Sequence, residues 1–420
     1  MKATNQDLPQ AVVVGGGIGG FTAALALAQR GLQVQLLERA PAFKEIGAGL
    51  QVGPNAARVL KDLGVLDSVL QRAVLPRRFA ILDIHSGNEL YHATFGETLS
   101  KRYGAPYAVM HRHDLLTALM DAASSTGRVE TIPGTEIVNL WQDENSVTVS
   151  SLDGRTYTAD VLIGADGLRS VVRRHVLDDS EPLMSEYVIY RGPGPRPKGI
   201  EDAVTLYTGD EMHMMQYPMA GGEMVNRVVS FRSTEGAPGS ETWGTREELL
   251  DRFSGACAHV RDSLQTLDLS QKGVQFDRKP MAGWTNGRVT LLGDAAHPMR
   301  QYLAQGAGQA MEDAVALADA LADQPGNITG ALQKYEKERY PRAAAVQMNT
   351  RFFGEMAHLG GVGAILRNSF FKKLPHDNFD LAEWLYGDGS VPPPLPPADV
   401  LDRLYAPLRQ ANPSPVTLSA

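Results

Sequence analysis

Cysteine, excess positive charge and long apolar runs are all scarce in this chain of 420 residues. The single cysteine, Cys257, excludes an intrachain disulfide and a cysteine metal cluster, so we expect no metal site. With 40 Lys and Arg against 48 Asp and Glu, the net charge is −8 and no basic stripe is present, which argues against a nucleic-acid partner. No apolar run reaches the ~18 residues that span a bilayer, and residues 1–10 lack the apolar segment of a signal peptide. These absences predict a cytoplasmic protein without a transmembrane segment.

The chain does contain a glycine-rich unit near its start. A Val-rich run at 11–14 predicts a buried parallel strand, the Ala/Leu-rich residues 21–30 predict a helix, and 32–37 predict a second strand. Three glycines between the first strand and the helix form a G-x-G-x-x-G motif. The motif alone would be a weak signal, but strand, glycines, helix, strand and a following acidic residue are typical of a unit that binds an adenine dinucleotide.

Each glycine of the motif has a physical role in such a unit. Gly15 permits a tight turn, Gly17 lets the backbone approach a pyrophosphate, and Gly20 lets the helix pack closely on the strand. The free N–H groups and partial positive charge of the helix N-terminus favour that pyrophosphate. Glu38 follows the second strand and can accept hydrogen bonds from a ribose diol, and we expect its neighbour Arg39 to contact the cofactor too. The unit by itself does not distinguish NAD from FAD.

Two later motifs place an aspartate after an apolar strand. Residues 161–163 lead into Asp166 in the sequence GADG, and residues 288–292 lead into Asp294 in GDAAHP. Open α/β sheets bind ligands at such strand ends, although an aspartate there can also cap a helix. A small-residue turn at 306–308 (Gly306, Ala307, Gly308) then precedes a long helix.

The pattern changes at about residue 183, where short alternating strands separated by Gly and Pro turns predict an antiparallel sheet. We therefore expect an α/β protein with a Rossmann-like nucleotide-binding domain, an inserted and mostly antiparallel substrate domain, and C-terminal helices. One helix is expected at 246–264, with Cys257 inside it. The predicted units are a discontinuous nucleotide-binding domain at 8–182 and 284–345, the sheet domain at 183–283, a helical segment at 346–390 and a Pro-rich tail at 391–420.

The three motifs, in this order and spacing, resemble those of the single-component, FAD-dependent aromatic hydroxylases, a group of flavoprotein monooxygenases. The resemblance covers roughly residues 10–390. It implies one FAD per chain, with NADH or NADPH as co-substrate, and a homodimer. It also implies that the first motif binds the ADP half of FAD, that the Asp166 motif contacts FAD and NAD(P)H, and that Asp294 binds the ribityl chain.

The resemblance places further residues at the cofactor. Arg112, in HRHDL, is expected near the FAD phosphates, and Gln51 lies in a glycine-rich loop expected to contact the cofactor. The helix that follows Gly306, Ala307 and Gly308 is expected to point its N-terminus at the N1–C2=O edge of the flavin, where its dipole would favour the negative charge of the reduced ring.

Within the family, the stretches GAGLQVGPNAARVL, RYGAPY, QYPMAGGEM and HLGG resemble members that convert 3-hydroxybenzoate to gentisate, and this is the substrate we expect. Salicylate and 6-hydroxynicotinate monooxygenases, which are decarboxylating, are the alternatives. The 6-hydroxynicotinate group is expected to carry histidines where this chain has Gln51 and Tyr302. A non-hydroxylating FAD oxidase or FAD-binding protein would share the cofactor motifs.

The reaction implied by the resemblance proceeds through a C4a-hydroperoxyflavin and needs two things from the protein. A phenol has a pKa near ~10, so it needs a partner that takes or shares its proton at pH 7. Water must also be kept out, since otherwise the oxidant decays to H2O2. We expect His213 to be the proton acceptor and Gln301 to hydrogen-bond the phenolic oxygen, while Tyr217 and Tyr103 hold the carboxylate or the ring. His213 alternates with Met215 and Tyr217 on one predicted strand face.

Overall fold

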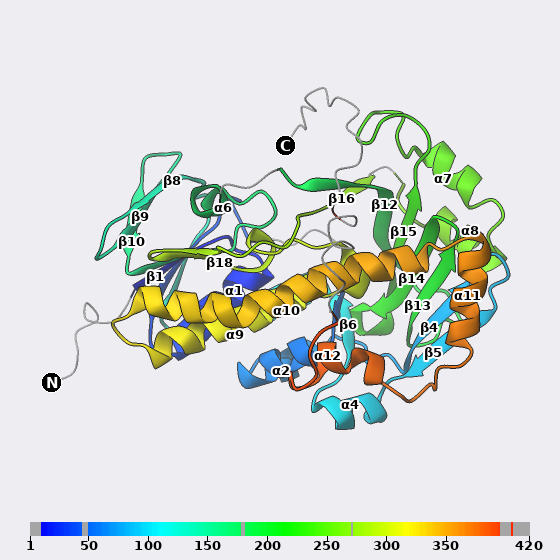
Figure 1. Cartoon of the computed structure of the whole chain (residues 1–420), viewed down its shortest axis with the longest axis horizontal. Coiled ribbons are helices and arrows are strands. Elements are labelled where there is room, and N and C mark those ends of the chain that lie inside the picture. The colour runs from blue at the N-terminus through cyan, green and yellow to red at the C-terminus, as the bar shows by residue number, and fades with distance from the viewer. Residues whose placement is uncertain (1–9, 44–48, 178–180, 270–271, 395–404, 406–420) are drawn as a thin grey trace.

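The computed structural model describes residues 10–43, 49–177, 181–269 and 272–394, together with Tyr405. It confirms the predicted α/β class. Figure 1 shows two sheet-based lobes, one around β1 (Gln10–Val14) and one around β14 (Met212–Met219), with the long helix α10 (Ile328–Ala357) running between them. The predicted Pro-rich tail lies outside the described residues except for 391–394 and Tyr405.

The first lobe is built on a six-stranded sheet in the order β17-β18-β11-β1-β2-β7. Its remaining strands are β2 (Gln33–Leu37), β7 (Val129–Ile132), β11 (Val161–Gly164), β17 (Thr285–Asn286) and β18 (Val289–Leu291). Neighbouring strands run parallel except for β17 and β18. The central strands are apolar along their length because packed elements cover both of their faces.

Three helices form a layer in this lobe, with α1 (Ile18–Gln29) packed against both α5 (Arg112–Ser125) and α9 (Gly306–Asp323). Nearly every residue of α1 is buried, which its Ala-rich sequence allows because small side chains let helices approach closely. A small antiparallel sheet of β8 (Ile137–Gln142), β9 (Val147–Ser151) and β10 (Thr156–Ala159) also packs on this lobe, as does α6 (Val171–Val176).

The second lobe contains a seven-stranded sheet in the order β16-β12-β15-β14-β13-β4-β5. Its strands are β4 (Arg78–Asp83), β5 (Glu89–Thr94), β12 (Leu183–Pro195), β13 (Ala203–Gly209), β14, β15 (Met224–Arg232) and β16 (Gly273–Asp277). All pairs are antiparallel except β4 with β13. The helices α7 (Arg246–Arg252) and α8 (Ala258–Gln265) cover one face of the sheet with an apolar cluster.

Two features of this lobe differ from the sequence-based expectation. The strands β4 and β5 come from residues 78–94, so the sheet extends beyond the predicted range 183–283. The single helix expected at 246–264 is two helices, and Cys257 is the N-cap residue of the second. The break follows from the chain turning sharply at Cys257, whose N–H bonds the carbonyl of Ile84 rather than continuing a helix.

The remaining elements connect and close the two lobes. They are β3 (Gly49–Val52), α2 (Pro54–Asp62), α3 (Leu66–Leu70), α4 (Glu97–Tyr103), β6 (Ala108–His111), α11 (Gly361–Phe371) and α12 (Glu383–Tyr386). β3 pairs antiparallel with β6 between the lobes. The predicted boundary at 345–346 falls inside α10, which is one continuous helix despite Pro341.

Candidate active site

A large cavity of about 1230 Å³ lies between the two lobes. Its wall on the first lobe comes from the starts of α1 and α9 and from the turn after β18. Its wall on the second lobe comes from β14 and β15, and α10, α11 and α12 complete it. The site therefore lies at the carboxyl ends of parallel strands, where open α/β sheets bind ligands.

The glycine motif forms a cradle that side chains could not occupy. Gly15 has φ of +112°, and a Cβ there would lie 2.3 Å from the carbonyl oxygen of Ala165. A Cβ on Gly20 would lie 1.8 Å from the carbonyl oxygen of Gly15. Gly17 caps α1 without any side-chain hydrogen bond and lines the cavity, so the first N–H groups of α1 are available to an anionic ligand there. This arrangement fits the pyrophosphate of an adenine dinucleotide.

The acidic residue after β2 has a local role in the structure. Glu38 accepts hydrogen bonds from the backbone N–H of Gly16 at 2.7 Å and of Ala40 at 2.8 Å, which fixes the turn beside the glycine motif. Neither Glu38 nor the exposed Arg39 is among the described residues that line the cavity. The predicted contacts of Glu38 with a ribose and of Arg39 with the cofactor therefore stay predictions.

The two aspartates that follow β11 and β18 differ in environment. The carboxylate of Asp166 accepts hydrogen bonds from Ser170 Oγ and from the N–H groups of Val171 and Val172, so it holds the start of α6. Asp294 instead lines the cavity, and its carboxylate accepts no hydrogen bond from the described residues. The Asp294 side chain is exposed to this cavity, yet desolvation at its enclosed position raises its pKa, and nearby His297 and Arg112 act in the opposite direction. An acceptor facing this cavity fits a hydroxyl-bearing ligand.

The helix α9 starts at the cavity. Gln305 is its N-cap residue and makes no capping side-chain bond, while Gly306 and Ala307 line the cavity. A Cβ on Gly306 would approach Asp294 Oδ1 to 3.7 Å, so the aspartate and the helix start are neighbours. Gly308 lies behind them, against Ala56 of α2. The partial positive charge of the α9 N-terminus is thus directed at the cavity, as expected for a site that stabilises negative charge on a bound ring.

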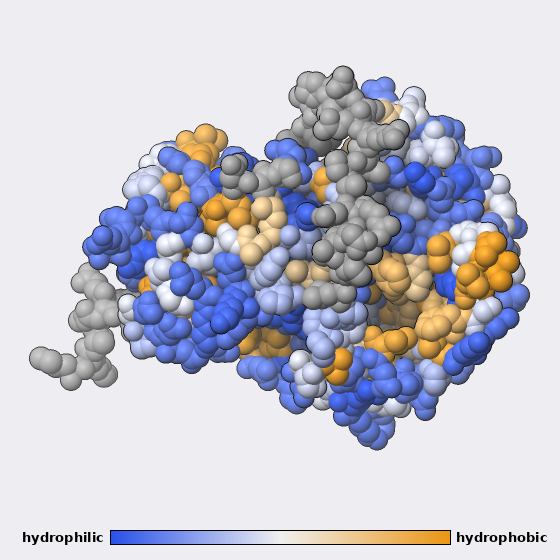
Figure 2. All heavy atoms as spheres, in the orientation of Figure 1, coloured by the Kyte–Doolittle hydropathy of each residue, from blue (hydrophilic) through white to orange (hydrophobic). Residues whose placement is uncertain are grey.

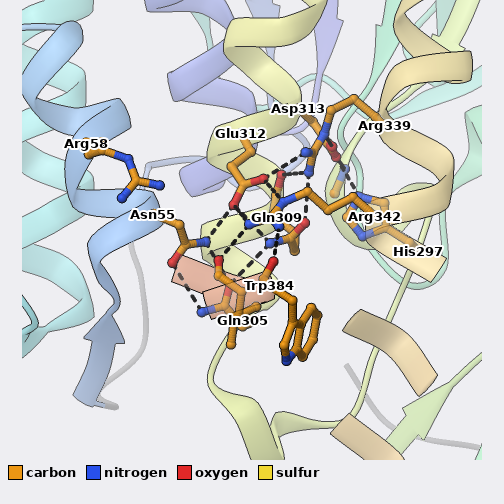
Figure 3. Close-up of polar contacts among 12 residues, drawn as sticks. Asn55, Arg58, His297, Gln305, Gln309, Glu312, Asp313, Arg339, Arg342 and Trp384 are labelled. Carbon is orange, nitrogen blue, oxygen red and sulfur yellow. Dashed lines mark hydrogen bonds and ion pairs between the residues drawn. The ribbon is translucent and has the colours of Figure 1, made fainter. Parts of the chain in front are cut away.

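Behind this helix start lies a buried polar network that joins α2, α9, α10 and α12 (Figure 3). Glu312 and Asp313 of α9 bind Arg339 at 2.7 Å each, and Arg342 binds Glu312 at 2.6 Å. Burial would raise the pKa of both carboxyls, but the charges of Arg339 and Arg342 around Glu312 hold its pKa at about 2. Asp313, beside His297 and Arg339, likewise has a pKa of about 2. The charged pairs therefore fix α9 against its neighbours.

The network also reaches the segment that closes the cavity. Arg342 donates to the carbonyl oxygens of Trp384 and Leu385, and Arg58 donates to those of Tyr386 and Gly387. Trp384, Leu385 and Tyr386 line the cavity. No motif in the sequence pointed to this network, because its members are isolated polar residues on separate helices.

On the other wall, His213 extends from β14 with Met215 and Tyr217 on the same strand face, and all three line the cavity. His213 is 3% exposed, and burial lowers its pKa to about 4, so its ring is neutral at pH 7. Its Nδ1 lies 2.7 Å from Nε2 of His358, and its Nε2 makes no hydrogen bond with the described residues. A neutral imidazole with one free nitrogen at a cavity can accept a proton.

Three of the other predicted site residues also line this cavity. Gln301, Gln51 and Arg112 line the same cavity as His213. Gln301 belongs to the 3-10 turn 301–303, and its backbone N–H donates to Gln275 Oε1 at 3.3 Å. Gln51 accepts a hydrogen bond from the Tyr107 hydroxyl at 2.7 Å.

Tyr103 is the predicted catalytic residue that the structure does not bring to the cavity. It is buried at the end of α4, where its hydroxyl lies 3.2 Å from the carbonyl oxygen of Phe379 and 3.3 Å from Glu383 Oε2. It is not among the described lining residues. Tyr107, four residues later, does line the cavity, and the aromatic spacing in RYGAPY could not distinguish the two.

The Tyr217 side chain lies so close to β3 that position 49 must be a glycine. A Cβ on Gly49 would lie 2.6 Å from Tyr217 Cε2 and 2.7 Å from Asn226 Cβ. The N–H of Gly49 donates to Asn226 Oδ1 at 3.0 Å. The backbone of β3 therefore passes directly beside the side chains of β14 and β15, and a larger residue would displace them.

The outer part of the cavity is apolar. Figure 2 shows apolar surface gathered over α11. Large apolar side chains exposed on α10, on α11 and between them are Phe352, Leu359, Val362, Ile365, Leu366 and Phe370. Four of them, Phe352, Leu359, Leu366 and Phe370, also line the cavity. In the described part of the chain, no helix has the length and apolar character to cross a membrane, and no cluster of His, Cys, Asp or Glu could hold a metal ion.

Comparisons with known proteins agree with this geometry. The family model described as FAD binding domain matches residues 9–350, so the chain belongs to this family. It is a FAD-dependent aromatic monooxygenase, with FAD as cofactor and NAD(P)H as co-substrate.

Individual relatives define the similarity further. The 3-hydroxybenzoate 6-hydroxylase of Polaromonas naphthalenivorans (strain CJ2) is 39% identical over 392 residues, which covers 92% of this chain and 98% of that protein. The protein of the same name from Klebsiella oxytoca is 40% identical over 387 residues, covering 90% and 96%. A crystal structure of Klebsiella pneumoniae HpxO complexed with FAD and uric acid has a TM-score of 0.79 at 25% identity, covering 91% of this chain and 95% of that one.

Proposed function

We propose that this enzyme converts 3-hydroxybenzoate to gentisate, consuming one O2, one NAD(P)H and one proton per turnover and releasing water and NAD(P)+. The coarser activity is that of a FAD-dependent aromatic monooxygenase. Support for the particular substrate comes from two relatives named as 3-hydroxybenzoate 6-hydroxylases, each matched over at least 96% of its length.

The observation that carries the proposal is the composition of the two cavity walls. The first lobe presents Asp294 and the start of α9, and the second presents the neutral His213. In para-hydroxylation the phenolic oxygen lies across the ring from the carbon that is attacked. A substrate lying between the walls can therefore offer one ring edge to the cofactor and its phenol to His213.

We infer the following roles for the residues on the substrate side. The free Nε2 of His213 takes the phenolic proton, which makes the ring a stronger nucleophile. Gln301 donates a neutral hydrogen bond to the phenolic oxygen, and Tyr217 binds the carboxylate or the ring edge. Burial raises the pKa of Tyr217 above its usual value, so its hydroxyl stays protonated as a donor.

The cofactor side has a separate task. Bound FAD would take a hydride from NAD(P)H and supply an electrophilic oxygen atom derived from O2. The residues that would hold it are the glycine cradle, Asp294 and the start of α9, with Arg112 nearby. The apolar outer cavity would keep water from the reacting atoms, which favours oxygen transfer over release of H2O2.

The test is a panel of substrates assayed for product, NAD(P)H consumption and H2O2 together. 3-Hydroxybenzoate should give gentisate in near-stoichiometric amounts with NAD(P)H. Salicylate and 6-hydroxynicotinate should give mainly H2O2 or no turnover. Formation of a decarboxylated product from either compound, with no gentisate from 3-hydroxybenzoate, would replace the proposal with one of the alternatives. NAD(P)H consumption without any hydroxylated product would indicate an oxidase.

A further inference from the structure

A second buried histidine lies directly behind His213. His358 is 5% exposed and is not among the described residues that line the cavity. Its Nε2 is 2.7 Å from Nδ1 of His213, and the two ring centroids are 4.9 Å apart. Any effect of His358 on a bound substrate must therefore pass through His213.

The position of the His358 ring is fixed on several sides. It stacks on Tyr187 of β12 at 4.2 Å between centroids with an interplanar angle of 14°. Tyr302 stands edge-on to it at 5.5 Å, with an angle of 82°. Its backbone is held as well, because its N–H donates to the carbonyl of Gly354 and its carbonyl accepts the N–H of Glu211. A ring whose position is fixed in this way can determine which ring nitrogen of His213 carries the proton.

Two neutral imidazoles that share a hydrogen bond must divide the roles of donor and acceptor between them. If Nδ1 of His213 carries the proton and donates it to His358, then Nε2 of His213 has a free lone pair. In the opposite tautomer, His213 carries its proton on Nε2 and cannot act as a base there. Only the first arrangement leaves a proton acceptor directed at a substrate.

We propose that His358 is a positioning residue for the hydroxylation: it accepts the Nδ1–H of His213 and so holds His213 in the tautomer whose Nε2 is the base. The consequence of this inference for catalysis rests on the proposed function. In the step it supports, the phenolic O–H bond breaks, its electron pair stays on oxygen, and a new N–H bond forms at Nε2. The Nδ1–H bond to His358 is kept throughout.

The groups around His358 favour its role as a neutral acceptor. Burial lowers its pKa well below the usual value, and His213, Arg300 and Arg367 lower it further, while Tyr187 and Tyr302 contribute no charge at neutral pH. The positive charge acquired with the phenolic proton therefore stays on His213, between the phenolate and His358. A phenolate in contact would also raise the pKa of His213 above its value in the empty cavity.

The tautomer can be measured directly in wild-type enzyme without substrate. In protein containing 15N-labelled histidine, the ring signals of His213, assigned by their loss in His213→Gln, should show a protonated Nδ1 and an unprotonated Nε2 at pH 7. The reverse pattern would overturn the proposal. Because this measurement needs no turnover, it stands apart from the proposed function, whose failure would appear as absence of gentisate from the wild-type enzyme.

Two substitutions test the consequence for catalysis. His358→Phe keeps a flat ring against Tyr187 but removes the acceptor, whereas His358→Gln keeps an acceptor within reach. We expect His358→Phe to lower the rate of gentisate formation by roughly 10- to 100-fold, an effect that approaches the loss of a general base. The pH dependence of this rate should shift to higher pH. Flavin reduction by NAD(P)H should change much less, and His358→Gln should recover most of the lost rate.

The matched control is His259→Phe. His259 also stacks on a tyrosine of this sheet, Tyr207, at 5.6 Å, but on the face covered by α7 and α8. This variant should keep the wild-type pH profile and coupling. The proposal fails if His358→Phe matches His259→Phe in both properties, or if His358→Gln is as impaired as His358→Phe. Should His358→Phe not fold, the His358→Gln profile and the 15N measurement decide the outcome.

Discussion

Arg342 binds Glu312 through both carboxylate oxygens, with Nε 2.6 Å from Oε2 and Nη2 2.9 Å from Oε1. The same guanidinium donates to the carbonyl oxygens of Trp384 and Leu385, so one residue of α10 links α9 to the segment that closes the cavity. The pair is more than three-quarters buried on each side. It is therefore weakly screened by solvent.

Replacing Arg342 with methionine should destabilise the protein by about 3 kcal/mol, because a mostly buried carboxylate loses its bidentate partner. The 383–386 helix should also exchange its amide hydrogens faster. Urea unfolding and hydrogen exchange measure these effects. Lys334→Met on the same helix removes an exposed pair with Asp323 and should leave the urea midpoint unchanged. Equal midpoints for the two variants would contradict this account of the network.

Asp294→Ala should weaken FAD binding by roughly tenfold or more, since a hydrogen bond to a charged group contributes about 1.5–3 kcal/mol. Flavin content after dialysis and the FAD dissociation constant are the measurements. Asp294→Asn should lose less, because an amide oxygen still accepts. Asp319→Asn, on the exposed face of α9, is the control. Unchanged affinity in Asp294→Ala would remove this residue from the cofactor site.

His213→Ala should reduce gentisate formation about 10²–10⁴-fold, the usual range for a lost general base. Gln301→Ala should act in the same direction but more mildly, because it removes only a neutral hydrogen bond. In both variants flavin reduction should suffer less than hydroxylation, so H2O2 per NAD(P)H should rise. Wild-type coupling in both variants would show that these side chains only pack.

Stability should fall with decreasing pH between about 6.5 and 4 because of His213. Its pKa is about 4 when folded and near 6.5 when unfolded, so the unfolded state binds more protons in this range. At pH 5 this linkage costs about 2 kcal/mol of stability relative to neutral pH. His358 adds to the effect in the same direction. Urea unfolding at pH 7 and 5, with saturating FAD, should show a smaller pH dependence in His213→Gln, and an equal dependence would disprove the burial of a neutral ring.

Local patterns in the sequence were sufficient for the parts of the molecule that depend on neighbouring residues. The strand, glycine turn and helix around Gly15 and Gly17 form from one continuous segment, and the alternation on β14 places His213 and Tyr217 on one face. Asp294 follows its strand into the cavity as the motif suggests. These features depend on local backbone conformation and on the alternation of side chains along a strand. Short stretches of sequence encode both.

Features that depend on long-range contacts could not be predicted. We expected Tyr103 to hold the carboxylate or the ring, but its hydroxyl contacts Phe379, and Tyr107 lines the cavity instead. The partner of His213 comes from the end of α10, and nothing near His358 in the sequence indicates a neighbour on a strand. Asp166 caps a helix, a role that the same motif allowed equally.

The parallel pairing of β4 with β13 has a consequence for how the chain is made. Arg78 leaves the ribosome long before Ala203, its partner in the sheet, and β16 completes the sheet only at Asp277. Until β13 has been made, β4 and β5 can form only a two-stranded ribbon, which is marginal by itself in water. Nascent chains should therefore hold an unpaired strand edge through much of synthesis, which favours association with chaperones and slow, late assembly of the cavity. A fragment cut at 183–283 lacks β4 and β5, so the edge of β13 would stay open permanently.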